Sequence, residues 1–204
     1  MKIIKPYVEF ITPINKEEIY KKIELCGRVC YKTEDKITED SATKFVSMIM
    51  KRGHEAVIEH KSVTVKVVCD RGVSHEIVRH RLASYCQEST RYCNYSNDRF
   101  GNELTFIEPC FWSSSSSLMK SWRIMINGCE KLYLKMLESG ATPQEARSVL
   151  PNSLKTEIIM TMNLREWRHF FRLRCSEAAH PQMREVALMI QKEFIEKLPE
   201  IFNA

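Results

Sequence analysis

The sequence lacks an apolar run long enough to cross a membrane, and its first residues lack the apolar stretch and cleavage site of a secretory signal. We therefore expect a soluble protein of the reducing cytoplasm whose eight cysteines are free thiols. No Cys-x-x-Cys pair occurs, and the spacings of Cys26 with Cys30 and of Cys86 with Cys93 do not match the common zinc sites. No metal is expected.

The sequence also lacks a strong excess of either charge. Its 31 Lys and Arg against 26 Asp and Glu give a formal net charge of +5. A protein that works on nucleic acid typically carries a larger excess on one face, whereas a modest positive charge suits an enzyme of anionic small molecules. A chain of 204 residues can bury roughly 70% of its unfolded surface. With no internal repeat or boundary, we expect a single domain over residues 1–204 with one core.

Apolar residues recur with both helical and strand periods, so we expect a mixed α+β fold. Asn15 precedes two glutamates and predicts a helix start, and the pair Thr142-Pro143 predicts another. A serine run over residues 113–117 predicts the turn that begins a long helix. Strands are expected over residues 2–13, 62–69, 104–107 and 154–163, and further helices over residues 41–51, 73–82, 118–140, 164–175 and from 181 onward.

Residues 79–91 concentrate hydrogen-bond donors. They read Arg-His-Arg-Leu-Ala-Ser-Tyr-Cys-Gln-Glu-Ser-Thr-Arg, at the end of the helix expected over residues 73–82 and the start of a polar loop expected over residues 85–97. A guanidinium donates two parallel hydrogen bonds to a phosphate and stays charged at physiological pH. We therefore expect a buried, donor-rich pocket wall that binds more than one anion. The alternative is a surface helix with solvated charges, because long charged side chains usually face water.

The same stretch carries a family resemblance. Arg79-His80-Arg81, seven further residues and then Ser89, followed by Arg91-Tyr92, resembles the signature of the flavin-dependent thymidylate synthases. Matching blocks stand in the family's order over most of the chain. They are Gly53-His54-Glu55, Glu59-His60, Glu145-Ala146-Arg147, Val149-Leu150-Pro151, Asn163-Leu164-Arg165, Phe170, Arg174 and Gln182 with Arg184-Glu185.

The resemblance implies a fold, a reaction and an assembly. The fold would be helices packed on a mainly antiparallel, twisted sheet, in a homotetramer whose subunits share active sites. The reaction would be methylation of deoxyuridylate (dUMP) at C5, with FAD as the cofactor and with methylenetetrahydrofolate and NADPH as co-substrates. The cofactor would carry the hard chemistry while the protein binds, orients and supplies charge. Neither nucleic acid nor membrane would be a partner.

The resemblance also implies roles for individual residues. Arg174 would be the catalytic residue, stabilising negative charge on the uracil ring as C5 becomes nucleophilic. The FAD site would comprise Ala56, Glu59, Arg79, His80, Arg81, Gln87, Asn163, Arg165 and His169. The dUMP site would comprise Glu76, Arg79, Gln87, Glu88, Ser89, Thr90, Arg91, Arg147 and Arg174.

The chain departs from the family pattern at several of these positions. Glu76 stands where glutamine is usual and adds a negative charge near a dianionic nucleotide. Cys86 stands where asparagine is common, Gln87-Glu88 where a glutamate and an apolar residue are common, and Ala56-Val57 where a hydroxyl residue and proline are frequent.

Three alternatives stay open from the sequence. Cys86 could attack C6 of the pyrimidine, as cysteine does in the unrelated thymidylate synthases, because neighbouring arginines favour a thiolate. The interleaved basic and aromatic residues from Arg79 to Tyr95 also resemble those of single-stranded nucleic-acid binders. A family member that has lost synthase activity would have the same signature.

Overall fold

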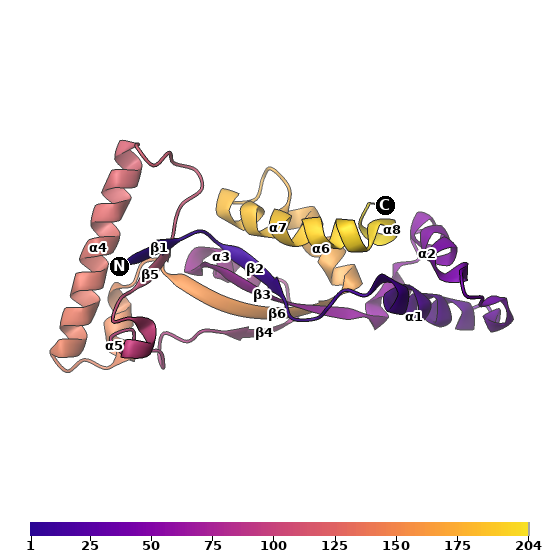
Figure 1. The fold of residues 1–204 in the computed structure, drawn as a ribbon, viewed down its shortest axis with the longest axis horizontal. Helices are drawn as coiled ribbons and strands as arrows, with labels where there is room; N and C mark the ends of the chain where they lie inside the picture. The colour runs from indigo at the N-terminus through magenta and orange to yellow at the C-terminus, as the bar shows by residue number, and fades with distance from the viewer. Residues whose placement is uncertain (204) are drawn as a thin grey trace.

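The computed structural model describes residues 1–203, and an antiparallel four-stranded sheet runs through its centre (Figure 1). The strand order is β2 (Tyr7–Phe10), β3 (Ser62–Asp70), β6 (Lys155–Asn163) and β4 (Ser84–Gln87). β3 and β6 pair along their whole length, from Ser62 opposite Asn163 to Asp70 opposite Lys155. The antiparallel sheet with helices agrees with the expected fold.

The first predicted strand is divided in two, which corrects the expectation of one strand over residues 2–13. β1 (Lys2–Ile4) pairs in parallel with β5 (Thr105–Ile107) in a separate two-stranded sheet, whereas β2 joins the main sheet. Pro6 lies at the break. Proline has no N–H to give to a strand ladder, so the chain can change sheets there at little cost.

Helices cover the sheet and extend the molecule at both ends (Figure 1). α6 (Leu164–Arg174), α7 (Pro181–Lys197) and α8 (Pro199–Phe202) lie over one face. α1 (Lys16–Val29) and α2 (Ser41–Lys51) form one end, and α4 (Ser117–Glu138) and α5 (Pro143–Ala146) form the other. The remaining helical segments are α3 (Arg71–Ile77) and four 3-10 turns, η1 (Glu34–Lys36), η2 (Glu55–His60), η3 (Asp98–Phe100) and η4 (Arg147–Val149).

Local capping explains where several helices begin, as the sequence predicted. Asn15 Oδ1 accepts from the Glu18 amide at 3.2 Å, and Ser116 Oγ accepts from the Met119 amide at 3.1 Å. The Glu145 carboxylate accepts from the Thr142 amide at 2.8 Å. Each bond gives an acceptor to a backbone N–H group at the start of a helix, where the helix itself provides none.

The central helix and loop differ from the prediction. α3 ends at Ile77 instead of near residue 82, and Leu82 is 75% exposed. The hydroxyl of Tyr85 bonds the carbonyl oxygens of Ile77 (2.9 Å) and His80 (2.7 Å), and the chain then enters β4, which pairs with β6. The predicted loop over residues 85–97 therefore begins as a strand, because pairing with a distant strand outweighs the local polar composition.

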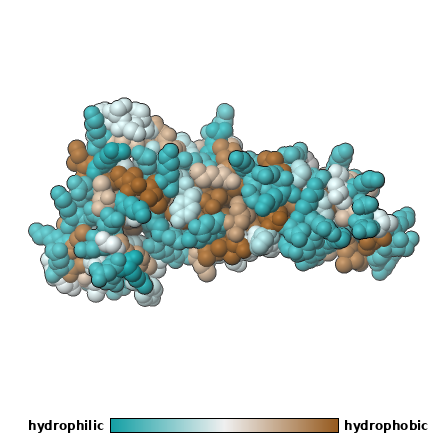
Figure 2. All heavy atoms as spheres, in the orientation of Figure 1, coloured by the Kyte–Doolittle hydropathy of each residue, from teal (hydrophilic) through white to brown (hydrophobic). Residues whose placement is uncertain are grey.

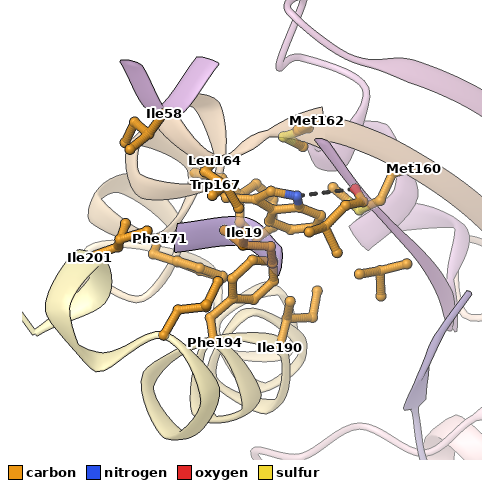
Figure 3. Close-up of a cluster of buried hydrophobic side chains, with 14 of the residues drawn as sticks. Ile19, Ile58, Met160, Met162, Leu164, Trp167, Phe171, Ile190, Phe194 and Ile201 are labelled. Atoms are coloured by element: carbon orange, nitrogen blue, oxygen red, sulfur yellow. Dashed lines mark hydrogen bonds between the residues drawn. The ribbon is translucent and has the colours of Figure 1, made fainter. Parts of the chain in front are cut away.

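The buried side chains form two clusters instead of the single core expected. The larger lies among α1, α2, α6, α7 and the main sheet. Trp167 is fully buried there, packs on Phe171 and Phe194, and donates its indole N–H to the Val63 carbonyl at 3.2 Å (Figure 3). The second cluster is built around α4 and includes Leu104, Phe106, Trp122, Ile126 and Tyr133.

One side of α4 stays exposed in the protomer. Apolar groups lie among hydrophilic ones at the end of the molecule that carries this helix (Figure 2). The large apolar side chains that α4 exposes are Leu118, Ile124, Met125 and Leu132. Within residues 1–203 no helix combines the length and apolarity that a bilayer span requires.

Candidate active site

Arg174, the last residue of α6, is held by three hydrogen bonds to two residues from the α3 region. Its Nε donates to His80 Nε2 at 3.0 Å, its Nη1 donates to Glu76 Oε2 at 2.8 Å, and its Nη2 donates to the Glu76 carbonyl at 3.1 Å. Bonds in three directions fix the plane of the guanidinium. The sequence separates the partners by more than ninety residues, and the fold brings them together.

The contact with Arg174 sets the protonation of His80. A guanidinium can only donate, so Nε2 accepts and a neutral imidazole carries its proton on Nδ1. That nitrogen lies 3.4 Å from Glu166 Oε1. Burial, together with the charges of Arg174 and His169, lowers the pKa of His80 to about 4. His80 is therefore a neutral acceptor for Arg174 at physiological pH, while burial raises the pKa of the Glu166 carboxyl.

A histidine and carboxylate trio surrounds this contact. Donor atoms of His80, Glu166 and His169 lie within 4.8 Å of one another, a spacing that could hold a metal ion. However, Nε2 of His80 accepts from Arg174, and Nδ1 of His169 lies 2.8 Å from Arg172 Nη2. A cation bound to the trio would have to displace the Nδ1 proton of His80. The arrangement is better described as a hydrogen-bonded network than as a prepared ligand set.

A hollow of about 1000 Å³ opens beside the trio. Arg165 forms ion pairs with Glu55 and Glu59, and Arg168 pairs with Glu55 at 3.1 Å. The lining combines cations, carboxylates, an amide and aromatic rings. It consists of Glu55, Glu59, Leu82, Asn163, Arg165, Glu166, Arg168, His169, Phe171, Arg172, Gln191 and Phe202.

Four of the predicted FAD ligands lie in this hollow: Glu59, Asn163, Arg165 and His169. Asn163 ends β6 and also caps α6, since its Oδ1 accepts from the Glu166 amide at 2.9 Å. His80 connects this hollow to the hydrogen bonds of Arg174. Its ring centroid lies 5.8 Å from that of His169, which lines the hollow.

The predicted nucleotide residues on β4 and after it make contacts within the protein. Gln87 donates to Ser74 Oγ at 2.9 Å and to Thr156 Oγ1 at 3.2 Å. Glu88 accepts from the Tyr95 hydroxyl at 2.9 Å and from Lys155 at 3.1 Å. Their predicted roles toward FAD and dUMP stay predictions.

The turn that follows holds the remaining predicted nucleotide donors of this stretch. Thr90 is buried. Ser89 Oγ accepts from the Arg91 amide at 3.3 Å, and the Arg91 guanidinium lies over the Tyr92 ring.

The expectation of a buried arginine wall is wrong for the protomer. Arg79, Arg81 and Arg91 are all exposed, and so are Arg147 and Ala56. None of these five residues lines the large hollow. α3 ends at Ile77, before Arg79, so the helix that was expected to carry Arg79 beside its apolar side stops short of it.

Sequence reasoning missed several residues of the hollow. Arg168 and Arg172 lie four residues apart on α6, a spacing that places both on one side of a helix. Spacing alone does not distinguish residues that line a hollow from residues on a solvated surface. Glu166, Gln191 and Phe202 carried no local signal, because they reach the hollow from the start of α6, from α7 and from α8.

This geometry defines a protein with a large hollow, lined by paired arginines and carboxylates and by aromatic rings, beside a rigidly held arginine. Residues 14–200 match the family model described as thymidylate synthase complementing protein. The chain is 34% identical to the flavin-dependent thymidylate synthase of Geobacter sulfurreducens, over 89% of this chain and 79% of that protein. It is 36% identical to the enzyme of Pyrococcus furiosus and 38% identical to that of Pyrococcus horikoshii, over 80% of this chain and 66% and 67% of those proteins.

The chain thus spans about two thirds of the length of the two Pyrococcus relatives. The match over most of its own length shows that it belongs to the flavin-dependent thymidylate synthase family.

Proposed function

We propose that this protein converts dUMP to thymidylate with FAD as its cofactor. Methylenetetrahydrofolate gives the one-carbon unit and NADPH gives the hydride, so the products are thymidylate, tetrahydrofolate and NADP⁺. The proposal is based mainly on the position of Arg174. Three hydrogen bonds hold its permanently charged guanidinium beside the large hollow. The family membership supports the same reaction.

The lining of the hollow fits a flavin dinucleotide. Arg165 and Arg168 would exchange their carboxylate partners Glu55 and Glu59 for a diphosphate. Arg172 adds a third guanidinium to the lining, and Asn163 and His169 offer groups that hydrogen-bond to a polar ring edge. Phe171 and Phe202 add apolar wall. Bound FAD, once reduced by NADPH, supplies the hydride.

In this proposal the chain's own residues position and polarise the nucleotide. Arg174 faces a uracil carbonyl and N3 and stabilises the negative charge that makes C5 nucleophilic. His80 and Glu76 keep the guanidinium in place before the nucleotide arrives, which lowers the ordering cost of the reaction. Ser89, Thr90, Arg91 and Arg147 bind the phosphate.

We propose further that the whole chain acts as one domain within a homotetramer that completes each site. Arg79, Arg81, Arg91 and Arg147 are exposed in the protomer and lie outside the hollow. The exposed apolar side of α4 is a surface that a second copy would cover. Arginines from one subunit and the hollow of another would then form one site.

The test is an anaerobic incubation of the purified protein with FAD, NADPH, dUMP and methylenetetrahydrofolate, followed by chromatography for thymidylate. As a control, protein that has first been stripped of its flavin is incubated in the same mixture without FAD. Product only in the complete mixture supports the proposal. A flavin-loaded protein that forms no thymidylate would contradict it.

A further inference from the structure

Glu166, in the first turn of α6, is a buried carboxylate without a cationic partner. Its exposed fraction is 8%. Within residues 1–203 no lysine or arginine lies within ion-pair distance of it. The ring that it contacts, His80, is neutral at physiological pH because burial and the charge of Arg174 lower its pKa to about 4. Burying a charge without a partner costs folding free energy, so this carboxylate calls for a role other than stability.

The two other buried glutamates of residues 1–203 do have cationic partners. Glu24 accepts from Arg28 Nε at 2.7 Å and from Ser41 Oγ at 2.8 Å. Glu130 lies 3.1 Å from the amino group of Met1. Of the three buried glutamates, only Glu166 faces a neutral ring, and that ring belongs to the candidate active site.

The position of Glu166 on α6 offers a simpler explanation that must be tested against the contact. A carboxylate in the first turn of a helix is stabilised by the helix dipole. That effect needs a negative charge but no particular acceptor atom. A hydrogen bond from His80 needs an acceptor atom but no charge. Replacement of Glu166 by glutamine, which keeps an acceptor and loses the charge, therefore separates the two explanations.

The packing around His80 leaves its proton as the main freedom of the ring. The ring centroid lies 4.9 Å from that of Phe170, and the backbone carbonyl accepts from the Tyr85 hydroxyl at 2.7 Å. A proton on Nδ1 points at Glu166 Oε1, 3.4 Å away, which is long for a hydrogen bond. The lone pair on Nε2 is then free for Arg174. A proton on Nε2 would instead set an N–H group against the donors of the guanidinium.

We propose that Glu166 is a positioning residue that acts on Arg174 through His80. Its carboxylate accepts the Nδ1 proton of His80, which keeps Nε2 as an acceptor and holds the guanidinium plane in one orientation. This rests on the proposed function, because there Arg174 is the group that stabilises charge on the uracil ring. Glu166 takes no part in bond making or proton transfer.

The first experiment reads the tautomer of His80 directly. Nitrogen-15 NMR of the FAD-loaded protein with labelled histidine, at pH 7.5, distinguishes protonated from unprotonated ring nitrogens, and His80→Gln identifies the signals of this ring. We expect the proton on Nδ1 in the unaltered protein and in Glu166→Gln. In Glu166→Leu, which removes the acceptor, the Nε2-protonated form should become detectable. A proton on Nε2 in the unaltered protein, or an unchanged spectrum in Glu166→Leu, would overturn the proposal.

The second experiment measures kcat at saturating FAD and dUMP. Glu166→Leu should lower kcat about fivefold to tenfold, the effect of losing one buried hydrogen bond in the site, while Glu166→Gln should stay within about twofold. Glu24→Leu is the control, since it makes the same change at a buried glutamate that holds Arg28 instead. It should lower the melting temperature and leave kcat of the folded protein within about twofold.

The two readouts separate the possible failures. Equal losses of kcat in Glu166→Gln and Glu166→Leu would favour the helix dipole and refute the positioning role, and so would full activity in Glu166→Leu. The NMR measurement needs no turnover and the unaltered protein alone tests the tautomer, so a variant that fails to fold does not remove the test. A protein with the expected tautomers that forms no thymidylate would contradict the proposed function and leave the contact between Glu166 and His80 in place.

Discussion

Arg174 and His80 meet through Nε and Nε2 at 3.0 Å, and this contact makes the imidazole an acceptor. Protonation of His80 would place an N–H against a guanidinium that also only donates. The network therefore depends on a neutral His80, which burial and the neighbouring positive charges favour. The stability of the fold and the orientation of Arg174 are linked through one proton.

We predict that His80 makes the folded protein less stable as pH falls from 6.5 toward 4. The folded pKa of about 4 lies below the ordinary 6.5, so in this window the unfolded chain binds a proton that the native protein does not. At pH 5 this lowers the unfolding free energy by about 1 to 2 kcal/mol. Urea unfolding at pH 5 and pH 7.5 should show that His80→Gln removes this part of the pH dependence. An unchanged pH dependence in the variant would refute the assignment.

Replacing Glu76 with glutamine should tighten dUMP binding. The amide oxygen can still accept from Arg174 Nη1, but the negative charge next to a dianionic nucleotide is gone. We expect the KM for dUMP to fall about threefold to tenfold, a modest electrostatic effect at a half-buried site. Glu17→Gln, which makes the same charge change at an exposed ion pair on α1, is the control. A KM that rises in Glu76→Gln would show that the carboxylate itself binds the nucleotide.

Cys86 and Arg174 should differ sharply when each is replaced with alanine. Cys86 is exposed on β4 and has no role in the proposed reaction, so Cys86→Ala should keep kcat within about twofold. Arg174→Ala removes the charge aimed at the pyrimidine and should lower kcat about 10²-fold to 10³-fold. Flavin absorbance must show that both proteins still hold FAD. Loss of turnover in Cys86→Ala would instead favour a cysteine nucleophile.

The contact between α1 and α2 should be sensitive to a single methyl group at Gly27. A Cβ built there lies 2.6 Å from two ring carbons of Phe45. Gly27→Ala should therefore lower the unfolding free energy by about 1 to 3 kcal/mol. Gly128→Ala on α4 is the opposite case, since its Cβ meets no atom within 4 Å, and it should raise stability by about 0.5 to 1 kcal/mol. Thermal unfolding measures both, and equal shifts would contradict the packing argument.

Helices and strands whose ends and periodicity depend on residues close in the sequence were predictable. The helix starts at Asn15 and Ser116 follow from side chains that cap a backbone three residues away. β6 and α6 follow from alternating and helical periods in neighbouring stretches. The boundary of α3 was not predictable, because it depends on the Tyr85 hydroxyl and on pairing with a strand some seventy residues later.

The residues of the candidate site also differ in how far the sequence could predict their place. The family resemblance singled out Arg174, His80 and Asn163, but no local pattern could show that Arg174 and His80 touch. Glu166 gave no signal at all, since its importance comes from a contact across 86 positions of the chain. The roles of the exposed Arg81 and Arg147 stay predictions for the assembled protein.

The division of the buried side chains into two clusters gives each half of the molecule its own optical reporter. Trp167 lies in the cluster under α6, and Trp122 lies in the cluster around α4. A third tryptophan, Trp112, packs against the α4 cluster, so variants that keep either Trp167 alone or Trp122 alone would emit from one cluster at a time. Their fluorescence during denaturation would show whether the two halves melt together or in sequence.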